Sequence, residues 1–272
     1  MDTDKTTAVV DIFDEFRKDI DEHNDRRERL IKASRDVTNI SKKVIFLLHR
    51  IMTERGNDTR DPFKHAAERG RNGLREAQVL YAQMKHEIQG DEFWRYHRAV
   101  SPGLQEYIEA LSFAHYLEHG TLVTYAQVQD TLSDDSGVPY LPLPKEDYLL
   151  GLSDLTGELM RFAISGIARK GGRTKATEVC AFVRQCKSDF ERFTPVVREL
   201  SKKQSVTTQS LEKIEDAVYA IVVRSSEYDL PPEAVDDIVA QSISSFGTGS
   251  GVDRSKRGRR DPGSGDEYEG EY

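Results

Sequence analysis

The feature that most constrains the fold is a helical repeat of apolar residues that covers the first fifty positions. Between residues 9 and 51, apolar side chains recur at intervals of three and four, with one polar gap from His23 to Arg29. The positions are Val9, Phe13, Phe16, Ile20, Leu30, Val37, Ile40, Val44, Leu48 and Ile51. This spacing predicts one very long helix. Because a helix of this length packs against partners along its apolar face, the sequence predicts a helical bundle.

The rest of the chain continues the helical pattern, and no segment alternates convincingly between apolar and polar residues. Asp61 is a predicted N-cap followed by Pro62 at the first helical position, and His119-Gly120 is a predicted helix end. The expected helices after the first cover about 61–89, 91–118 with Pro102 inside, 122–132, 145–168, 174–193, 196–224 and 232–243. The fold class predicted is therefore all-α, a multi-helix bundle of about seven or eight helices with a long N-terminal helix.

Composition indicates one helical domain, residues 1–246, and a C-terminal tail, residues 247–272. The tail lacks core-forming residues and holds a basic block followed by an acidic one, which predicts disorder. Its basic block, RSKRGRR, could be a nuclear localisation signal, an RNA-binding tail or neither.

Charge and cysteine content narrow the setting. The chain has 47 acids against 39 bases, and this excess of acids argues against a simple basic groove as the main nucleic-acid surface. Cys180 and Cys186 would stand ~9 Å apart along one helix axis, too far to form a disulfide. We therefore expect reduced thiols and a cytoplasmic or nuclear protein. No run approaches the ~20 apolar residues that span a bilayer, so no membrane association is expected.

Two otherwise apolar stretches carry paired acids. GLQEYIEALSF contains Glu106 and Glu109, and DYLLGLSDLTGELMR contains Asp154 and Glu158. At about 100° per residue, the two acids of a pair lie roughly 60° apart in the first stretch and roughly 40° apart in the second. Each pair therefore shares one helix face. Ionised carboxylates on an apolar surface are costly unless something positive meets them.

Spacing alone leaves the positive partner open. Arg161 stands three residues after Glu158 and is well placed for an ordinary salt bridge. Four carboxylates and one arginine nevertheless leave a surplus of negative charge, which two Mg²⁺ ions would balance. Gly151 and Gly157 on the acidic side leave room for another chain, a metal ion or a substrate. A di-iron centre is not supported, because none of the seven histidines follows an acid at a spacing of three, and the scattered histidines and cysteines do not make a zinc site.

Four motifs together resemble the translin-associated factor X branch of the translin family. They are SRDVTNISKKVIFLLHR, GLQEYIEALSFAHYL, DYLLGLSDLTGELMR and SLEKIEDAVYAIVVRSSEY, and the resemblance spans residues 10 to 228. Members of that family are all-helical and assemble with translin into a hollow hetero-oligomer, expected to be octameric, whose X-type subunits are Mg²⁺-dependent endoribonucleases. The family's acids match the four acids described above without substitution. The resemblance thus implies that Glu106, Glu109, Asp154 and Glu158 bind Mg²⁺, or Mn²⁺, and are catalytic.

The implied reaction is metal-assisted hydrolysis of single-stranded or nicked RNA, such as passenger-strand fragments or precursor-tRNA pieces. Candidate phosphate contacts lie on one sector of the first helix and on the two acidic stripes. They are Lys32, Arg35, Asn39, Lys42, Lys43, Arg50, Arg98 and Arg161. A charged sector is more often a solvated face or a subunit contact. The alternative function is a non-catalytic helical adaptor that stabilises translin and recruits further partners.

Overall fold

The computed structural model describes residues 2–54, 61–167 and 172–227, with side chains described between residues 10 and 220 of these ranges. The elements in chain order are α1 (Asp2–Thr53), α2 (Pro62–Met84), the 3₁₀ turn η1 (Lys85–Glu87), α3 (Asp91–His119), α4 (Tyr125–Thr131), α5 (Lys145–Gly166), α6 (Gly172–Glu191) and α7 (Arg198–Glu227). The described ranges hold no strand beyond one isolated bridge between Ser133 and Pro139. The predicted all-α class is confirmed.

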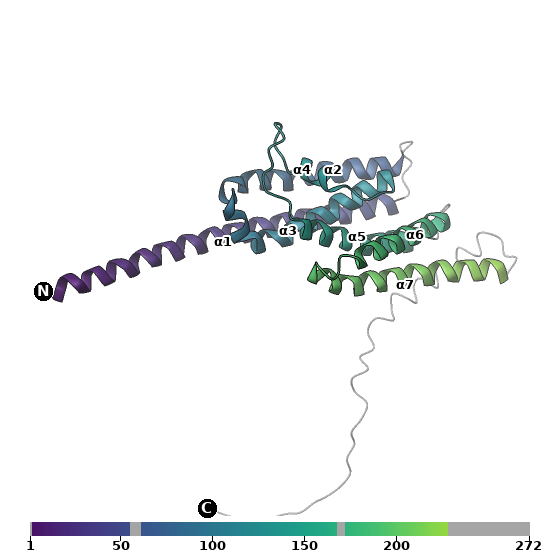
Figure 1. Ribbon diagram of the computed structural model, residues 1–272. Coiled ribbons are helices and arrows are strands. Elements are labelled where there is room, and N and C mark those ends of the chain that lie inside the picture. The colour runs from purple at the N-terminus through teal and green to yellow at the C-terminus, as the bar shows by residue number, and fades with distance from the viewer. Residues whose placement is uncertain (1, 55–60, 168–171, 228–272) are drawn as a thin grey trace, which may run out of the picture.

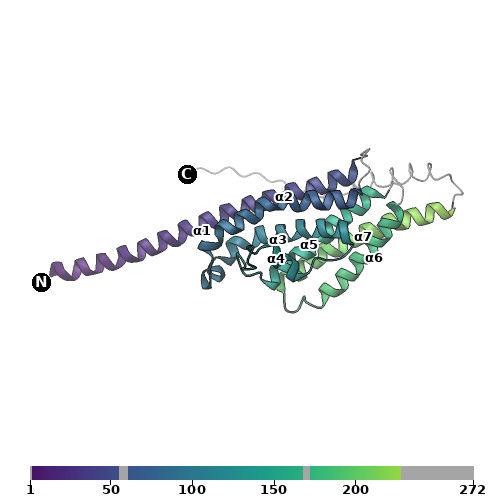
Figure 2. The same cartoon turned by 90° about the horizontal axis from the view of Figure 1, so that it is seen from above.

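The helices form two groups of three that meet along α3 and α5. In the first group α1, α2 and α3 contact one another, and in the second α5, α6 and α7 do so. The contact between α3 and α5 joins the groups, while α4 and the segment after it connect the same two helices along the chain (Figures 1 and 2). Both acid-bearing helices therefore lie at the joint of the molecule.

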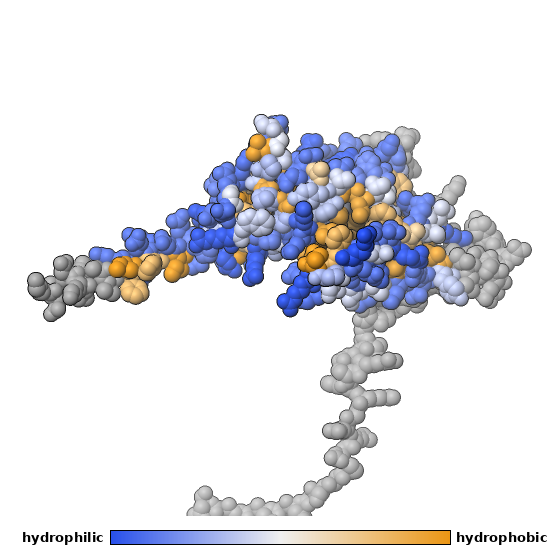
Figure 3. All heavy atoms as spheres, viewed as in Figure 1, coloured by the Kyte–Doolittle hydropathy of each residue, from blue (hydrophilic) through white to orange (hydrophobic). Residues whose placement is uncertain are grey.

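The long helix α1 extends well beyond the body at its N-terminal end, as both views show (Figures 1 and 2). Every described side chain from residue 10 to residue 22 is exposed, and Leu30 is the first buried one. The exposed part includes an apolar row that we call the N-terminal stripe, visible as orange atoms on the projecting helix in Figure 3. Its members are Ile12, Phe13, Phe16 and Ile20. The long N-terminal helix is thus confirmed, but this chain covers its apolar face only from Leu30 onward.

Helix ends agree with the predicted caps at several points. The Asp61 side chain accepts a hydrogen bond from the Phe63 N–H at 3.0 Å, and Gly120 adopts the left-handed conformation, with φ 69°, after α3. Three boundaries were wrong by three residues or more, among them the end of α7, which was predicted at 224 and lies at Glu227. The second helix was predicted to reach residue 89, but α2 ends at Met84, where the backbone tightens into the 3₁₀ turn.

The fourth helix was predicted to start near residue 122, but α4 starts at Tyr125. Thr124 and Gln127 form a reciprocal capping box that sets the start of α4. The predicted helix at 232–243 and the tail at 247–272 lie outside the described residues. Cys180 and Cys186 are buried and unpaired on α6, as predicted. None of the described helices is both long and apolar enough to cross a bilayer.

Two glycines let the helices that surround the acids approach closely. A Cβ atom on Gly103 of α3 would lie 2.6 Å from the backbone oxygen of Ser34 on α1. A Cβ atom on Gly151 of α5 would lie 2.7 Å from the Cβ atom of Ile108 on α3. The prediction that Gly151 leaves room for a ligand is therefore wrong, because α3 fills this space. Gly157 does have open space, since a Cβ atom on it would meet no neighbouring atom within 4 Å.

Candidate active site at the joint of α3 and α5

The four acids singled out in the sequence form one electrostatic group, which we call the acidic face. Glu106 and Glu109 lie on α3, and Asp154 and Glu158 lie on α5. The pKa of Glu109 is raised to about 8. Burial is the largest cause, and the negative charges of Asp154, Glu158 and Glu106 add to it. Each of the other three acids therefore acts on Glu109. The fold brings together carboxylates that are some fifty residues apart in the sequence.

Glu109 differs from the other three acids in having no direct partner for its carboxyl group, although the charge of Lys203 lowers its pKa slightly. Among the described residues, its carboxyl group forms no hydrogen bond and no ion pair. With a pKa of about 8, Glu109 keeps its proton at neutral pH in the metal-free protein. Burial also raises the pKa of Asp154, although a hydrogen bond from Lys203 opposes this shift. Glu109 is thus the acid of the acidic face that burial and its acidic neighbours perturb most.

Two lysines from distant helices meet two of the acids. Lys42 of α1 places its Nζ atom 3.1 Å from Oε1 of Glu106, and Lys203 of α7 donates a hydrogen bond to Oδ2 of Asp154. The Lys42 side chain is 62% exposed, whereas the Lys203 side chain is 24% exposed. Lys42 therefore lies at the solvent rim of the acidic face and Lys203 lies inside it.

Glu158, the most buried of the four acids, has two donors. The His49 Nε2 atom of α1 lies 2.5 Å from Oε2 of Glu158, and the Arg161 Nη1 atom lies 3.2 Å from the same oxygen. The predicted salt bridge between Arg161 and Glu158 is confirmed. The His49 ring also contacts Phe113, with 4.7 Å between the ring centroids, which holds the imidazole against α3.

The carboxylates of Glu106, Asp154 and Glu158 are oriented toward these partners within the chain. In the part of the chain that the structure describes, no group of three or more His, Cys, Asp or Glu side chains is placed to hold a metal ion. The donor chemistry still suits a hard divalent cation, because the four carboxylates offer only oxygen ligands. A cation would have to take over oxygens that now face Lys42, Lys203 and His49.

A partly buried hydrogen-bond network around Asp147 connects α3 and α5 beside the acidic face. The Asp147 carboxylate, buried on α5, accepts hydrogen bonds from His97 Nε2 at 2.6 Å, from Ser101 Oγ at 2.6 Å and from Gln105 Nε2 at 2.8 Å. The hydrogen bond that His97 donates to Asp147 raises the pKa of His97. Gln105 in turn accepts a hydrogen bond from Lys203 at 3.3 Å. Asp147 thus fixes the amide that positions the lysine.

Sequence reasoning missed Asp147, His49 and Lys203. Asp147 had a usable signal, since it precedes Asp154 by seven residues and so lies on the same stripe of α5. His49 and Lys203 had none, because each belongs to a helix whose packing partner is not visible in a local pattern.

The cations predicted to contact RNA fall into three sets. Lys42 and Arg161 lie on the rim of the acidic face, and both are exposed. Arg50 pairs with Glu54, the residue after the end of α1, with 3.6 Å between the Nε and Oε1 atoms. The remaining ones are exposed and form no ion pair with any described residue; they are Lys32, Arg35, Lys43 and Arg98. Asn39 is exposed as well.

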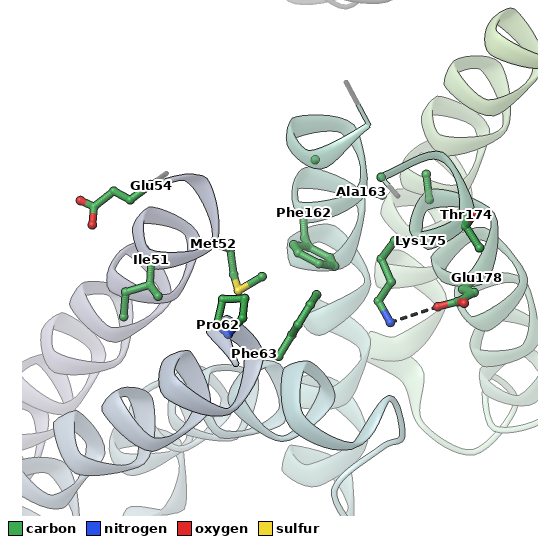
Figure 4. Close-up of a pocket in the computed structure, with 13 residues that line it drawn as sticks. Ile51, Met52, Glu54, Pro62, Phe63, Phe162, Ala163, Thr174, Lys175 and Glu178 are labelled. Carbon is green, nitrogen blue, oxygen red and sulfur yellow. Dashed lines mark hydrogen bonds and ion pairs between the residues drawn. The ribbon is translucent and has the colours of Figure 1, made fainter. Parts of the chain in front are cut away.

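An apolar cavity of about 470 Å³ lies next to the acidic face, between the ends of α1 and α5 and the starts of α2 and α6. Figure 4 shows Phe63 and Phe162 pointing toward one another in this cavity, with Lys175 beside them. Phe162 follows Glu158 by one helical turn, so the two sites are neighbours on α5. None of the four acids lines the cavity, whose mostly apolar wall carries Glu54, Lys175 and Glu178 at its edge, so the chemistry predicted for the four carboxylates lies outside it.

The sequence of the chain matches a known protein family and several known relatives. Residues 25–225, more than half of the 272 residues, match the family model described as Translin family. The chain belongs to the translin family. It is 35% identical over 257 residues to Translin-associated protein X of Rattus norvegicus, a match that covers 87% of this chain and 86% of the rat protein. It is 30% identical over 220 residues to the Translin-associated protein X homolog of Schizosaccharomyces pombe, covering 79% and 89% of the two chains.

Translin itself is a more distant relative within the translin family. Homo sapiens Translin is 23% identical over 218 residues, covering 80% of this chain and 94% of that protein. Among solved structures, apo-NeC3PO has a TM-score of 0.58 at 16% identity, covering 76% of this chain and 95% of that one. The AfC3PO complex with duplex RNA has a TM-score of 0.58 at 22% identity, covering 78% and 97%. These structures share the helical translin-family fold.

Proposed function

We propose that this chain is the catalytic subunit of a translin-type hetero-oligomer that hydrolyses single-stranded or nicked RNA, such as passenger-strand fragments or precursor-tRNA pieces, with Mg²⁺ or Mn²⁺. The observation that carries the proposal is the gathering of Glu106, Glu109, Asp154 and Glu158 at the joint of α3 and α5, where their charges and burial act together on Glu109. Similarity to Translin-associated protein X over most of the chain supports a role as a partner of translin.

The donor set supports a divalent cation as cofactor. All four residues carry carboxylates, the ligands that Mg²⁺ and Mn²⁺ prefer. Once bound, such an ion supplies positive charge that polarises the scissile phosphate and lowers the pKa of a water molecule. Glu109 contributes a carboxyl that holds its proton at neutral pH in the metal-free protein and would give it up on binding a cation. A half-buried, unpaired acid has no evident structural benefit, since burial makes its charge costly.

The rim of the acidic face supports RNA as the substrate. Lys42 and Arg161 are exposed at the border of the four acids, where their positive charges can meet backbone phosphates without depending on base sequence. The two cations then orient the strand across the carboxylates, and the reaction needs no protein nucleophile. Lys32, Arg35 and Lys43 continue the exposed basic surface along α1.

The partner is proposed to be translin in an octameric assembly, located in the cytoplasm, the nucleus or both. The net charge of −8 fits a subunit that relies on a more basic partner for affinity toward RNA. One of the structures with a similar fold, that of AfC3PO, is in complex with duplex RNA.

The test is co-expression with the cognate translin, followed by cleavage of a labelled single-stranded RNA in Mg²⁺ and in EDTA. Cleavage is expected in Mg²⁺ and its loss in EDTA. Translin assembled alone is the control for activity from the other subunit. A Glu76→Gln complex, which changes an exposed acid on α2 far from α5 in sequence, is the control for a change of surface charge. Cleavage in EDTA, or no cleavage by the assembled complex, would refute the proposal. The second result would leave the adaptor function.

A further inference from the structure

Lys203 occupies an unusual position for a lysine. Its ammonium group reaches from α7 into the joint of α3 and α5, and its side chain is only 24% exposed. There it meets three oxygen atoms, which are Oδ2 of Asp154, Oε1 of Gln105 and the backbone oxygen of Leu150. The distances to the latter two are both 3.3 Å. A lysine ammonium has three N–H donors, so all of them have an acceptor.

The three acceptors come from two different helices and include a charged, an amide and a carbonyl oxygen. Oxygen atoms of these three kinds also bind hard divalent cations. The amide of Gln105 is held in place because its Nε2 atom donates to Asp147 at 2.8 Å and to Ser101 at 3.0 Å. Its oxygen therefore faces Lys203 in a fixed direction. The cradle around the ammonium is built by the protein and not by a flexible side chain alone.

A lysine in this position and a metal ion on Asp154 exclude one another. Both are cations that seek the same carboxylate oxygen, and two cations within a few ångströms of each other in a half-buried site repel strongly. From this geometry we infer that Lys203 is a tethered counter-cation, which a divalent metal ion must displace from Asp154 when it binds. Lys203 thereby raises the metal concentration at which the site fills. The inference rests on the proposed metal site and adds its regulation.

Removing the ammonium group of Lys203 should make Mg²⁺ bind more tightly. In the complex with translin, Lys203→Met is expected to lower the Mg²⁺ concentration of half-maximal thermal stabilisation by about tenfold, because the competing cation is gone. Lys203→Arg keeps the charge and is expected to stay close to wild type. Lys202→Met removes an exposed neighbouring lysine and is the matched control. The readout is melting temperature against Mg²⁺ concentration, independent of RNA cleavage.

The outcomes separate this inference from the proposed function. An unchanged or higher Mg²⁺ midpoint for Lys203→Met would overturn the competition, and a higher midpoint would show that Lys203 positions Asp154 for the metal. If Lys203→Met fails to assemble, Lys203→Gln, which keeps hydrogen bonding but not charge, gives the same comparison. A complex that binds Mg²⁺ with the expected shift but cleaves no RNA would refute the proposed function and support the inference. The absence of any Mg²⁺-dependent stabilisation in wild type would overturn both.

Discussion

The acidic face and the N-terminal stripe are two regions in which side chains and surroundings are mismatched in opposite ways. In the acidic face, four carboxylates lie half-buried or buried within the joint of α3 and α5. In the N-terminal stripe, large apolar side chains point into solvent, and Phe13 is 67% exposed. The first mismatch is reduced inside this chain by Lys42, His49, Arg161 and Lys203. The second is not reduced by any described residue of the chain.

This difference indicates what each region requires. The carboxyl of Glu109, which has no direct partner among the described residues, can be met by a small cation that leaves the fold unchanged. The N-terminal stripe needs several hundred square ångströms of apolar cover, and an exposed apolar patch of that size marks a surface for protein contact. The chemistry of the molecule is therefore expected at the joint of the helices and its assembly along the projecting helix. Each of the following changes tests one side of this contrast.

The largest effect is expected for Asp154→Asn in the complex with translin. The change keeps the shape of the side chain and removes one negative charge from the acidic face, so RNA cleavage should fall by about a thousandfold or more. Melting temperature in EDTA should change little, because losing the pair with Lys203 and removing a charge whose burial is costly act in opposite directions. Cleavage per assembled complex is the measurement. A correctly assembled variant with wild-type cleavage would remove Asp154 from the catalytic group.

The next effect concerns self-association of the isolated chain. Wild type is expected to be aggregated without its partner, and the double change Phe13→Glu with Phe16→Glu should weaken this association by roughly a hundredfold, since burying two phenyl groups contributes about 3 kcal/mol or more. Lys18→Glu changes the net charge by the same amount on the opposite side of α1 and is the control. Sedimentation velocity against concentration measures the outcome. A monodisperse wild-type monomer would count against the N-terminal stripe as an assembly surface.

A smaller effect is the pH dependence caused by Glu109. Its pKa is about 8 in the folded chain and near 4.5 in the unfolded chain, so the folded state binds more protons between these values. Stability in EDTA should then fall as pH rises from about 5 to 8, by at most about 1.4 kcal/mol per pH unit, and stay level above pH 8.

Glu109→Gln should abolish this contribution, and chemical denaturation of both proteins at several pH values measures it. Equal slopes for the two proteins would contradict the burial and charge repulsion described at Glu109.

The smallest effect is expected for deletion of residues 247–272. The tail contains neither the paired acids of the acidic face nor the apolar spacing of the N-terminal stripe. Assembly with translin and the cleavage rate should both stay within about twofold of wild type. Size-exclusion chromatography and the RNA assay measure the two properties, and loss of the complex would assign the tail a role in assembly.

The sequence predicted most of the helices and the membership of the four acids in shared helix faces. Asp61, Pro62 and Gly120 end or begin helices through local hydrogen bonds and backbone angles, so their positions were visible in the sequence. The ends of α2 and α4 were predicted less well. A 3₁₀ turn and a capping box differ from a continuing helix by about one turn, and apolar spacing does not resolve that difference.

The sequence by itself determined that each pair of acids shares one face, because both members of a pair lie on one helix and the helical repeat of 3.6 residues sets their angle. Apart from Arg161, which stands three residues after Glu158 on the same helix, only the tertiary structure decided which residues contact these acids. Lys203 is 49 residues from Asp154, and His49 is 109 residues from Glu158. Contacts across such separations depend on how α1, α3, α5 and α7 pack, and that packing is set by many apolar contacts at once, together with the close approach that Gly103 and Gly151 permit.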